Sequence, residues 1–178
     1  MQMVKHRCPQ TAAAYDGQPS AAAEAQALVR KALNMTNDET QIRRLLDDFT
    51  HAIRNRDAAG AITLLAEDAV TFDLAPPLRM GPQATHDRTQ LERWFATWKS
   101  PINSQSHDLE IAVGDGVAYA YGLQNMTGTK TSGENVDLWF RSTACFRRED
   151  GRWRIAHMHN SVPITMDGSD KALLDLKP

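Results

Sequence analysis

The chain has 178 residues, of which 42% are hydrophobic and 24% are charged, and its formal net charge is −2 at pH 7. This length is enough for one domain with a buried core, and the composition is ordinary for a soluble globular protein. The charge gives no basic surplus for nucleic acid or an anionic membrane, and no apolar run approaches the ~20 residues of a membrane span.

The N-terminal stretch MQMVKHRCPQTAAAYDGQPS lacks the continuous apolar core of a signal peptide. The two cysteines, Cys8 and Cys145, lie far apart in unlike surroundings. Cys145 belongs to an apolar, strand-like run and is expected to be a small buried side chain. We therefore expect a cytoplasmic protein.

Residues 1–36 differ in composition from the rest of the chain, since they are rich in Ala, Gln, Pro and Ser. We expect them to form an extension that is mobile at its start and partly helical over residues 20–33, where good helix formers gather. The domain itself is predicted over residues 37–164, followed by a polar tail over 165–178.

The domain is predicted to begin with a long helix. Thr36 and Glu39 have the spacing of a capping box. An apolar stripe follows at helical spacing and indicates one buried face. The stripe consists of Ile42, Leu45, Leu46, Phe49 and Ile53.

Two shorter helices and one strand are predicted next. Asp57 can cap a short second helix, and residues 69–74 read as a strand that ends in a turn rich in proline. A third helix is predicted over residues 84–99. Its apolar face consists of Leu91, Trp94, Phe95 and Trp98.

The second half of the domain is predicted to be a meander of four long strands, over residues 104–113, 117–129, 135–149 and 152–162. Tight turns at Gly114-Asp115-Gly116 and Asp150-Gly151 separate the first pair and the last pair. Helices followed by such strands indicate an α+β fold with the helices on one face of an antiparallel sheet.

This order resembles the nuclear transport factor 2-like superfamily, which includes ketosteroid isomerase, the SnoaL-type polyketide cyclases, scytalone dehydratase and the calcium/calmodulin-dependent kinase II association domain. The resemblance covers residues 37–163 and depends on the segments AEDAVTFD, PPLRMG and FRREDGRWRIAHMHNSVP. It implies a cone-shaped (cystatin-like) α+β fold, in which a curved antiparallel or mixed sheet wraps around a long N-terminal helix. It also implies a pocket between helix and sheet, and homodimers formed through the outer face of the sheet.

The resemblance places Asp73 where ketosteroid isomerase has its general-base aspartate. The alternative is a strand-end aspartate that hydrogen-bonds the following turn. Phe49 and Ala144 occupy the positions of the isomerase's two enolate-stabilising donors, and neither side chain can donate a hydrogen bond. Phe95 occupies the position of its supporting tyrosine and is also apolar. Losing one such donor typically costs about 2.7–4 kcal/mol of transition-state stabilisation, which argues against steroid isomerisation by that mechanism.

Other polar groups could replace these donors. Tyr121 and Asn125 share one face of their strand, and the resemblance implies that this face looks into the pocket. The alternative for Tyr121 is an ordinary sheet tyrosine. The full set of predicted pocket residues, besides Asp73, is Phe49, Trp94, Phe95, Tyr121, Asn125, Phe140, Ser142, Met158 and Asn160.

His157 and His159 alternate on the last strand, so their imidazoles share a face, together with Trp153 and Ile155. Two imidazoles could supply two ligands of a zinc-like site, but no third ligand is evident, and we expect neither metal nor cofactor. The resemblance places His157 and His159 on the outer face at a dimer interface with Trp139 and Arg141. A β-bulge would reverse this assignment.

Two functions remain open from the sequence. The first is a SnoaL-like or ketosteroid isomerase-like protein whose pocket binds an unknown small molecule, with Asp73 as the base of an isomerase, cyclase or dehydratase type of reaction. The second is a non-catalytic ligand-binding or oligomerisation module. A second copy of the chain is the expected partner, and neither nucleic acid nor a membrane is expected.

Overall fold

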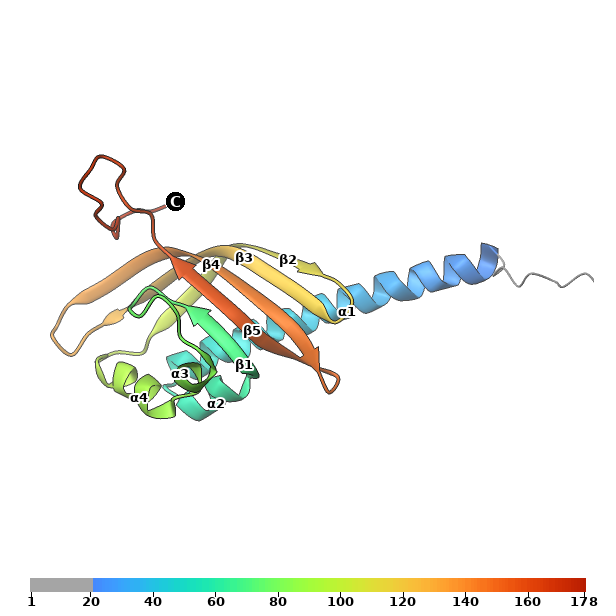
Figure 1. Cartoon of the computed structure of the whole chain (residues 1–178), viewed down its shortest axis with the longest axis horizontal. Helices are drawn as coiled ribbons and strands as arrows, with labels where there is room; N and C mark the ends of the chain where they lie inside the picture. The colour runs from blue at the N-terminus through green and yellow to red at the C-terminus, as the bar shows by residue number, and fades with distance from the viewer. Residues whose placement is uncertain (1–20) are drawn as a thin grey trace, which may run out of the picture. The chain divides into compact units, whose positions relative to one another are not determined.

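The computed structural model describes residues 21–178 (Figure 1), and the predicted mobile start of the extension lies outside the described residues. The chain divides into two compact units, residues 1–33 and 34–178. Helix α1, Ala21–Arg54, is continuous, so the prediction that a helix begins at Thr36 is wrong. The good helix formers before Thr36 extend the helix beyond the capping-box residues. Glu39 instead pairs with Arg43 one turn later, at 2.8 Å.

Three short helices follow α1 along the chain. Helix α2, Ala58–Thr63, is capped as predicted by Asp57, whose Oδ1 accepts a hydrogen bond of 2.8 Å from the Gly60 amide. The helix predicted over residues 84–99 is divided into α3, Pro82–Thr85, and α4, Arg88–Ala96. The division falls at Asp87, which accepts from the Gln90 amide and so caps α4.

Within the described part of the chain, five strands form one mixed sheet in the order β1-β5-β4-β3-β2. They are β1 Leu65–Phe72, β2 Asn103–Val113, β3 Val117–Thr129, β4 Asn135–Glu149 and β5 Arg152–Ser161. Strand β1 runs parallel to β5, and the other neighbours are antiparallel. The sheet is curved and does not close (Figure 1), which confirms the predicted α+β, cystatin-like fold.

Three register shifts interrupt the ladders, one in β5, one in β2 and one in β1 between Leu65 and Val70. In β5, Ile155 pairs with Phe146 while His157 pairs with Cys145, so Ala156 is an extra residue. Trp153 and Ile155 therefore face the core, whereas His157 and His159 face the other way, and the prediction that all four share one side is wrong. The second bulge lies in β2 between His107 and Glu110.

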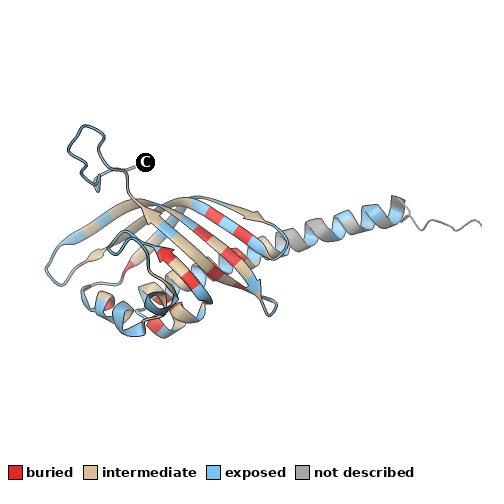
Figure 2. Ribbon diagram, viewed as in Figure 1, coloured by how far each residue is buried: buried red, intermediate tan, exposed pale blue. Residues whose placement is uncertain are grey.

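The core consists of two buried clusters (Figure 2). The first joins α1 to the sheet, since Ile42 and Leu45 belong to the same cluster as Ala144, Phe146 and Ile155. The second cluster joins α2 and α4, with Met126 and Val136 packed against it from the sheet. Its buried members are Ala58, Phe95, Trp98 and Ile102. No helix within residues 21–178 is long and apolar enough to cross a membrane.

Candidate functional site

A half-buried band crosses the concave face of the sheet between the two core clusters. Along β4, Ala144 belongs to the first cluster and Val136 packs against the second. Phe140 and Ser142 lie between them on the same face, because side chains alternate along a strand. Both are half-buried.

A chain of hydrogen bonds crosses three strands of this band. Ser142 on β4 faces Asn160 on β5, and its hydroxyl donates to Asn160 Oδ1 at 2.8 Å. The Asn160 amide then donates to Asp73 Oδ1 at 3.1 Å. Asp73 follows the end of β1 and is exposed. The structure thus brings together three of the predicted site residues.

Asp73 also hydrogen-bonds the turn that follows it, as the alternative interpretation predicts. The Leu74 amide donates to Asp73 Oδ1 at 2.8 Å. Two donors therefore fix one carboxylate oxygen. Within residues 21–178, the other oxygen, Oδ2, has no hydrogen-bond partner.

Thr71 is a residue of this face that sequence reasoning missed. It lies beside Met158 in the parallel ladder, two residues before Asp73, and is only 6% exposed. Its hydroxyl has no partner among the residues that the structure describes. A buried unsatisfied hydroxyl costs about 1–3 kcal/mol. The buried Thr71 hydroxyl therefore destabilises the folded state by about that amount.

The apolar residues predicted for the site lie in two groups, one at each of the core clusters that border the band. Phe49 and Met158 pack against the first cluster. Phe95 belongs to the second cluster and Trp94 packs against it, with their ring centroids 5.4 Å apart. Aromatic side chains therefore border the polar band at its α4 side.

Tyr121 and Asn125 lie on the opposite face, so their predicted place in the pocket is corrected. In the β3–β4 ladder, Tyr121 pairs with Thr143, whereas the core residue Ala120 pairs with Ala144. Tyr121 is 45% exposed and donates to Glu110 at 2.5 Å, a bond that raises the pKa of the tyrosine. The Asn125 amide donates to Asp137. Small alanines face the core here because large side chains already fill it from β4 and β5.

Gln124 is a second residue of the band that sequence reasoning missed. It pairs with Phe140 on one side and with Ser106 on the other, so it faces inward. Its carbonyl oxygen accepts from the Ser104 hydroxyl at 3.2 Å, and its amide donates to the Ser106 hydroxyl at 2.7 Å. The correct parity of β3, taken from the small Ala118 and Ala120, would have indicated it.

The four predicted interface residues lie on the outer face of the sheet. His157 Nδ1 lies 2.7 Å from the Val70 carbonyl, and Phe72 makes edge contacts with His157 and His159. Trp139 lies against the His107 ring, with centroids 4.6 Å apart, and Arg141 is exposed. No group of three potential metal ligands exists among residues 21–178.

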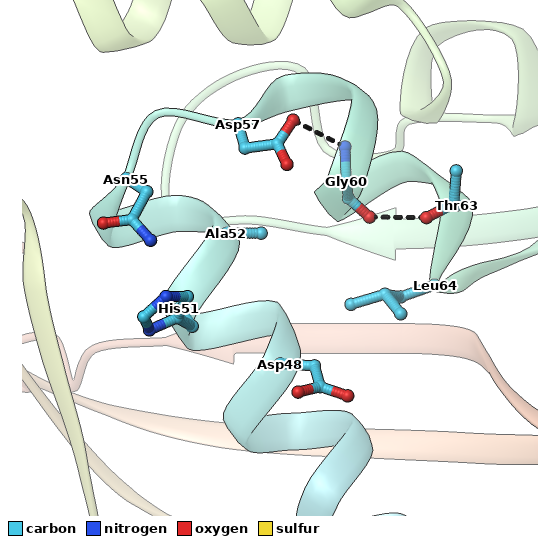
Figure 3. Close-up of a pocket in the computed structure, with 8 residues that line it drawn as sticks. All are labelled: Asp48, His51, Ala52, Asn55, Asp57, Gly60, Thr63 and Leu64. Carbon is cyan, nitrogen blue, oxygen red and sulfur yellow. Dashed lines mark hydrogen bonds between the residues drawn. The ribbon is translucent and has the colours of Figure 1, made fainter.

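A separate open groove of about 300 Å³ lies between α1 and α2 (Figure 3). It is lined by Asp48, His51, Ala52, Asn55, Asp57, Gly60, Thr63 and Leu64. Two of its polar groups have structural roles, since Asp57 caps α2 and the Thr63 hydroxyl donates to the Gly60 carbonyl. None of the predicted site residues lines this groove.

Comparison with known proteins agrees with the architecture. A family model described as a SnoaL-like domain matches residues 42–165, which is more than half of the chain. The chain belongs to the SnoaL-like domain family. No curated protein matches this SnoaL-like chain.

Solved structures of nuclear transport factor 2-like proteins resemble this SnoaL-like domain. A nuclear transport factor 2-like protein of unknown function from Pseudomonas putida KT2440 is 30% identical, with a TM-score of 0.70, and the match covers 80% of this chain and 98% of that one.

Two more distant structures share the fold alone. A protein proposed to be a scytalone dehydratase, from Novosphingobium aromaticivorans DSM 12444, is 16% identical, with a TM-score of 0.65 and coverage of 77% and 91%. A proposed calcium/calmodulin-dependent protein kinase II association domain from Xanthomonas campestris is 21% identical, with a TM-score of 0.59 and coverage of 67% and 84%.

Proposed function

We propose that this SnoaL-like domain binds a small carbonyl compound against the concave polar band and that Asp73 is a general base. The observation that carries the proposal is the Ser142–Asn160–Asp73 chain of hydrogen bonds. It fixes the carboxylate and leaves Oδ2 free at the open edge of the band.

The chemistry that suits this geometry is proton transfer next to a carbonyl group. Asp73 Oδ2 takes the proton from the carbon, the C–H electron pair forms the C=C bond of an enolate, and the carbonyl electrons move to oxygen. Return of the proton to another position gives an isomer, and loss of a neighbouring hydroxide gives a dehydration. The structural neighbour proposed to be a dehydratase supports this class of reaction.

Hydrogen–deuterium exchange of 4-phenylbutan-2-one in D₂O, followed by NMR, tests the proposal. Wild-type protein should accelerate exchange next to the carbonyl, and Asp73→Asn should lower the acceleration about 100-fold or more, since that is the usual contribution of a general base. Asp115→Asn, in the exposed β2–β3 turn, is the matched control and should keep the wild-type rate. Equal rates for wild type and Asp73→Asn would refute the assignment.

A second function is proposed for the outer face, as an interface with a second copy of the chain. This face exposes several aromatic and apolar side chains, including Phe72, Val117, Tyr119 and Tyr121. The likeness to a proposed association domain supports assembly in this fold.

Sedimentation equilibrium tests this interface. His159→Glu places a charge beside Phe72 on the outer face and should weaken a homodimer. Gln83→Glu changes charge in the exposed helix α3 and is the matched control. A monomer–dimer balance that responds equally to both substitutions would contradict the interface.

A further inference from the structure

Gln124 lies on the concave face at the opposite side of the band from Asp73. The sheet order places it on β3, with β4 between it and the Asn160 of β5 (Figure 1). Strands lie about 4.8 Å apart, and Gln124 and Asn160 are offset by two residues of about 3.4 Å along β4, so their backbones are roughly 12 Å apart. Phe140 and Ser142 fill the interval, so an aromatic surface lies between two polar groups.

The Gln124 amide is held in one orientation before any ligand arrives. Ser104 and Ser106 hold its oxygen and its nitrogen from the neighbouring strand. A primary amide has two N–H donors and two acceptor lone pairs. After these two bonds, Gln124 keeps one N–H and one lone pair. It can therefore both donate to and accept from a hydroxyl group.

The charges of the band restrict the ligand further. Among the residues that the ladders and hydrogen bonds place on the band, Asp73 alone carries a formal charge. The sheet offers no cation there that could pair with a carboxylate or phosphate. A desolvated anion beside Asp73 would be repelled, so an uncharged ligand fits best.

We propose that Gln124 determines specificity by binding the distal hydroxyl of an uncharged, elongated aromatic ketone whose carbonyl end lies at Asp73. This proposal rests on the proposed function of the band. Phe140 lies beneath the aromatic middle of the ligand. Gln124 takes no part in the proton transfer, because two strands, β4 and β5, lie between its own strand and the carboxylate that accepts the proton.

Three ketones of matched length test the proposal by isothermal titration calorimetry. They are 4-(4-hydroxyphenyl)butan-2-one, 4-phenylbutan-2-one, which lacks the hydroxyl, and 4-(3-oxobutyl)benzoate, which carries an anion in its place. Wild-type protein should bind the hydroxyl compound about tenfold more tightly than 4-phenylbutan-2-one, since one hydrogen bond contributes about that ratio. It should bind the benzoate more weakly than either.

Gln124→Leu should remove the preference for the hydroxyl compound and leave the affinity for 4-phenylbutan-2-one unchanged. Gln105→Leu is the matched control, because Gln105 pairs with Asn125 on the opposite face. If wild type binds both uncharged ketones equally, the Gln124 proposal fails while the proposed function stands. If wild type binds neither ketone, the proposed function fails and the Gln124 proposal fails with it. A preference retained in Gln124→Leu would also overturn the role of Gln124.

Discussion

The second core cluster should be sensitive to a single methyl group at Gly128. This glycine lies on the concave face of β3, opposite Val136. A Cβ atom built on Gly128 would lie 2.8 Å from Trp98 Cζ3 and 3.0 Å from the Pro101 carbonyl oxygen. Real Cβ contacts are longer, so the Gly128→Ala substitution must displace the indole or the backbone.

Neither neighbour can move freely. Trp98 is 2% exposed, and the Lys130 ammonium lies 3.6 Å from the centroid of its ring. Overpacking of this kind typically costs about 1–3 kcal/mol. For a chain of this size, 1 kcal/mol lowers Tm by about 2–4 °C, so Gly128→Ala should lower Tm by about 2–12 °C.

Differential scanning calorimetry measures this change. The matched control is Gly81→Ala, since a Cβ atom there would meet only the end of Arg79, at 3.4 Å. Its Tm should stay within about 2 °C of wild type, as for most surface substitutions. In the Trp98→Phe background, which lacks the clashing ring atoms, Gly128→Ala should cost less. A full additive loss in the double variant would refute the steric argument.

Three further predictions follow from the same structure. Thr71→Val removes the buried hydroxyl that has no partner among the described residues and should raise Tm by about 2–4 °C in calorimetry; a lower Tm would contradict the assignment. Burial raises the pKa of the Cys145 thiol, which lowers its reactivity. In the Cys8→Ser variant at pH 7, a disulfide reagent should therefore react with Cys145 about tenfold more slowly in the folded protein than in the urea-unfolded protein. Equal rates would refute this. Hydrogen bonds from Lys177 and then Asn125 lower the pKa of Asp137. The resulting stabilisation of the C-terminal tail is therefore present above about pH 4, which is the pKa of Asp137 in the unfolded chain. It is lost as the pH falls through the lower pKa that Asp137 has in the folded protein. Amide exchange of the tail, corrected for intrinsic rates, should increase at pH 3, and Asp137→Asn should remove that dependence; a dependence that persists in the variant would point to another group.

The fold was predictable because its strands and turns have strong local signals. The β4–β5 turn, for example, needs two residues with positive φ, and Asp150 and Gly151 supply them with φ of 48° and 77°. The division into four long strands followed from such turns. The start of α1 was not predictable from the capping box, because helix propensity in the preceding residues decides whether a cap is used.

The site was harder to predict because it depends on which residues share a face. The extra residue, Ala156, reverses which side chains of β5 face the core beyond that point. An alanine side chain gives no sequence signal for a bulge. On β3 the large Tyr119 and Tyr121 are outside, while Ala118 and Ala120 are inside. Asp73 could be located from its position at a strand end. Gln124 could be located only from the parity of β3, which the small Ala118 and Ala120 indicate.

The interruption of β2 has a consequence for pairing of this strand with another chain. Strand β2 is one of the two edge strands of the sheet, where unpaired backbone groups could pair with another chain. The bulge contains Asp108, with φ of 51°, and is followed by the charged Glu110. A bent, acidic edge is a poor template for a further strand. A complex through the outer face, which is proposed above as the interface, need not extend the sheet into a fibre.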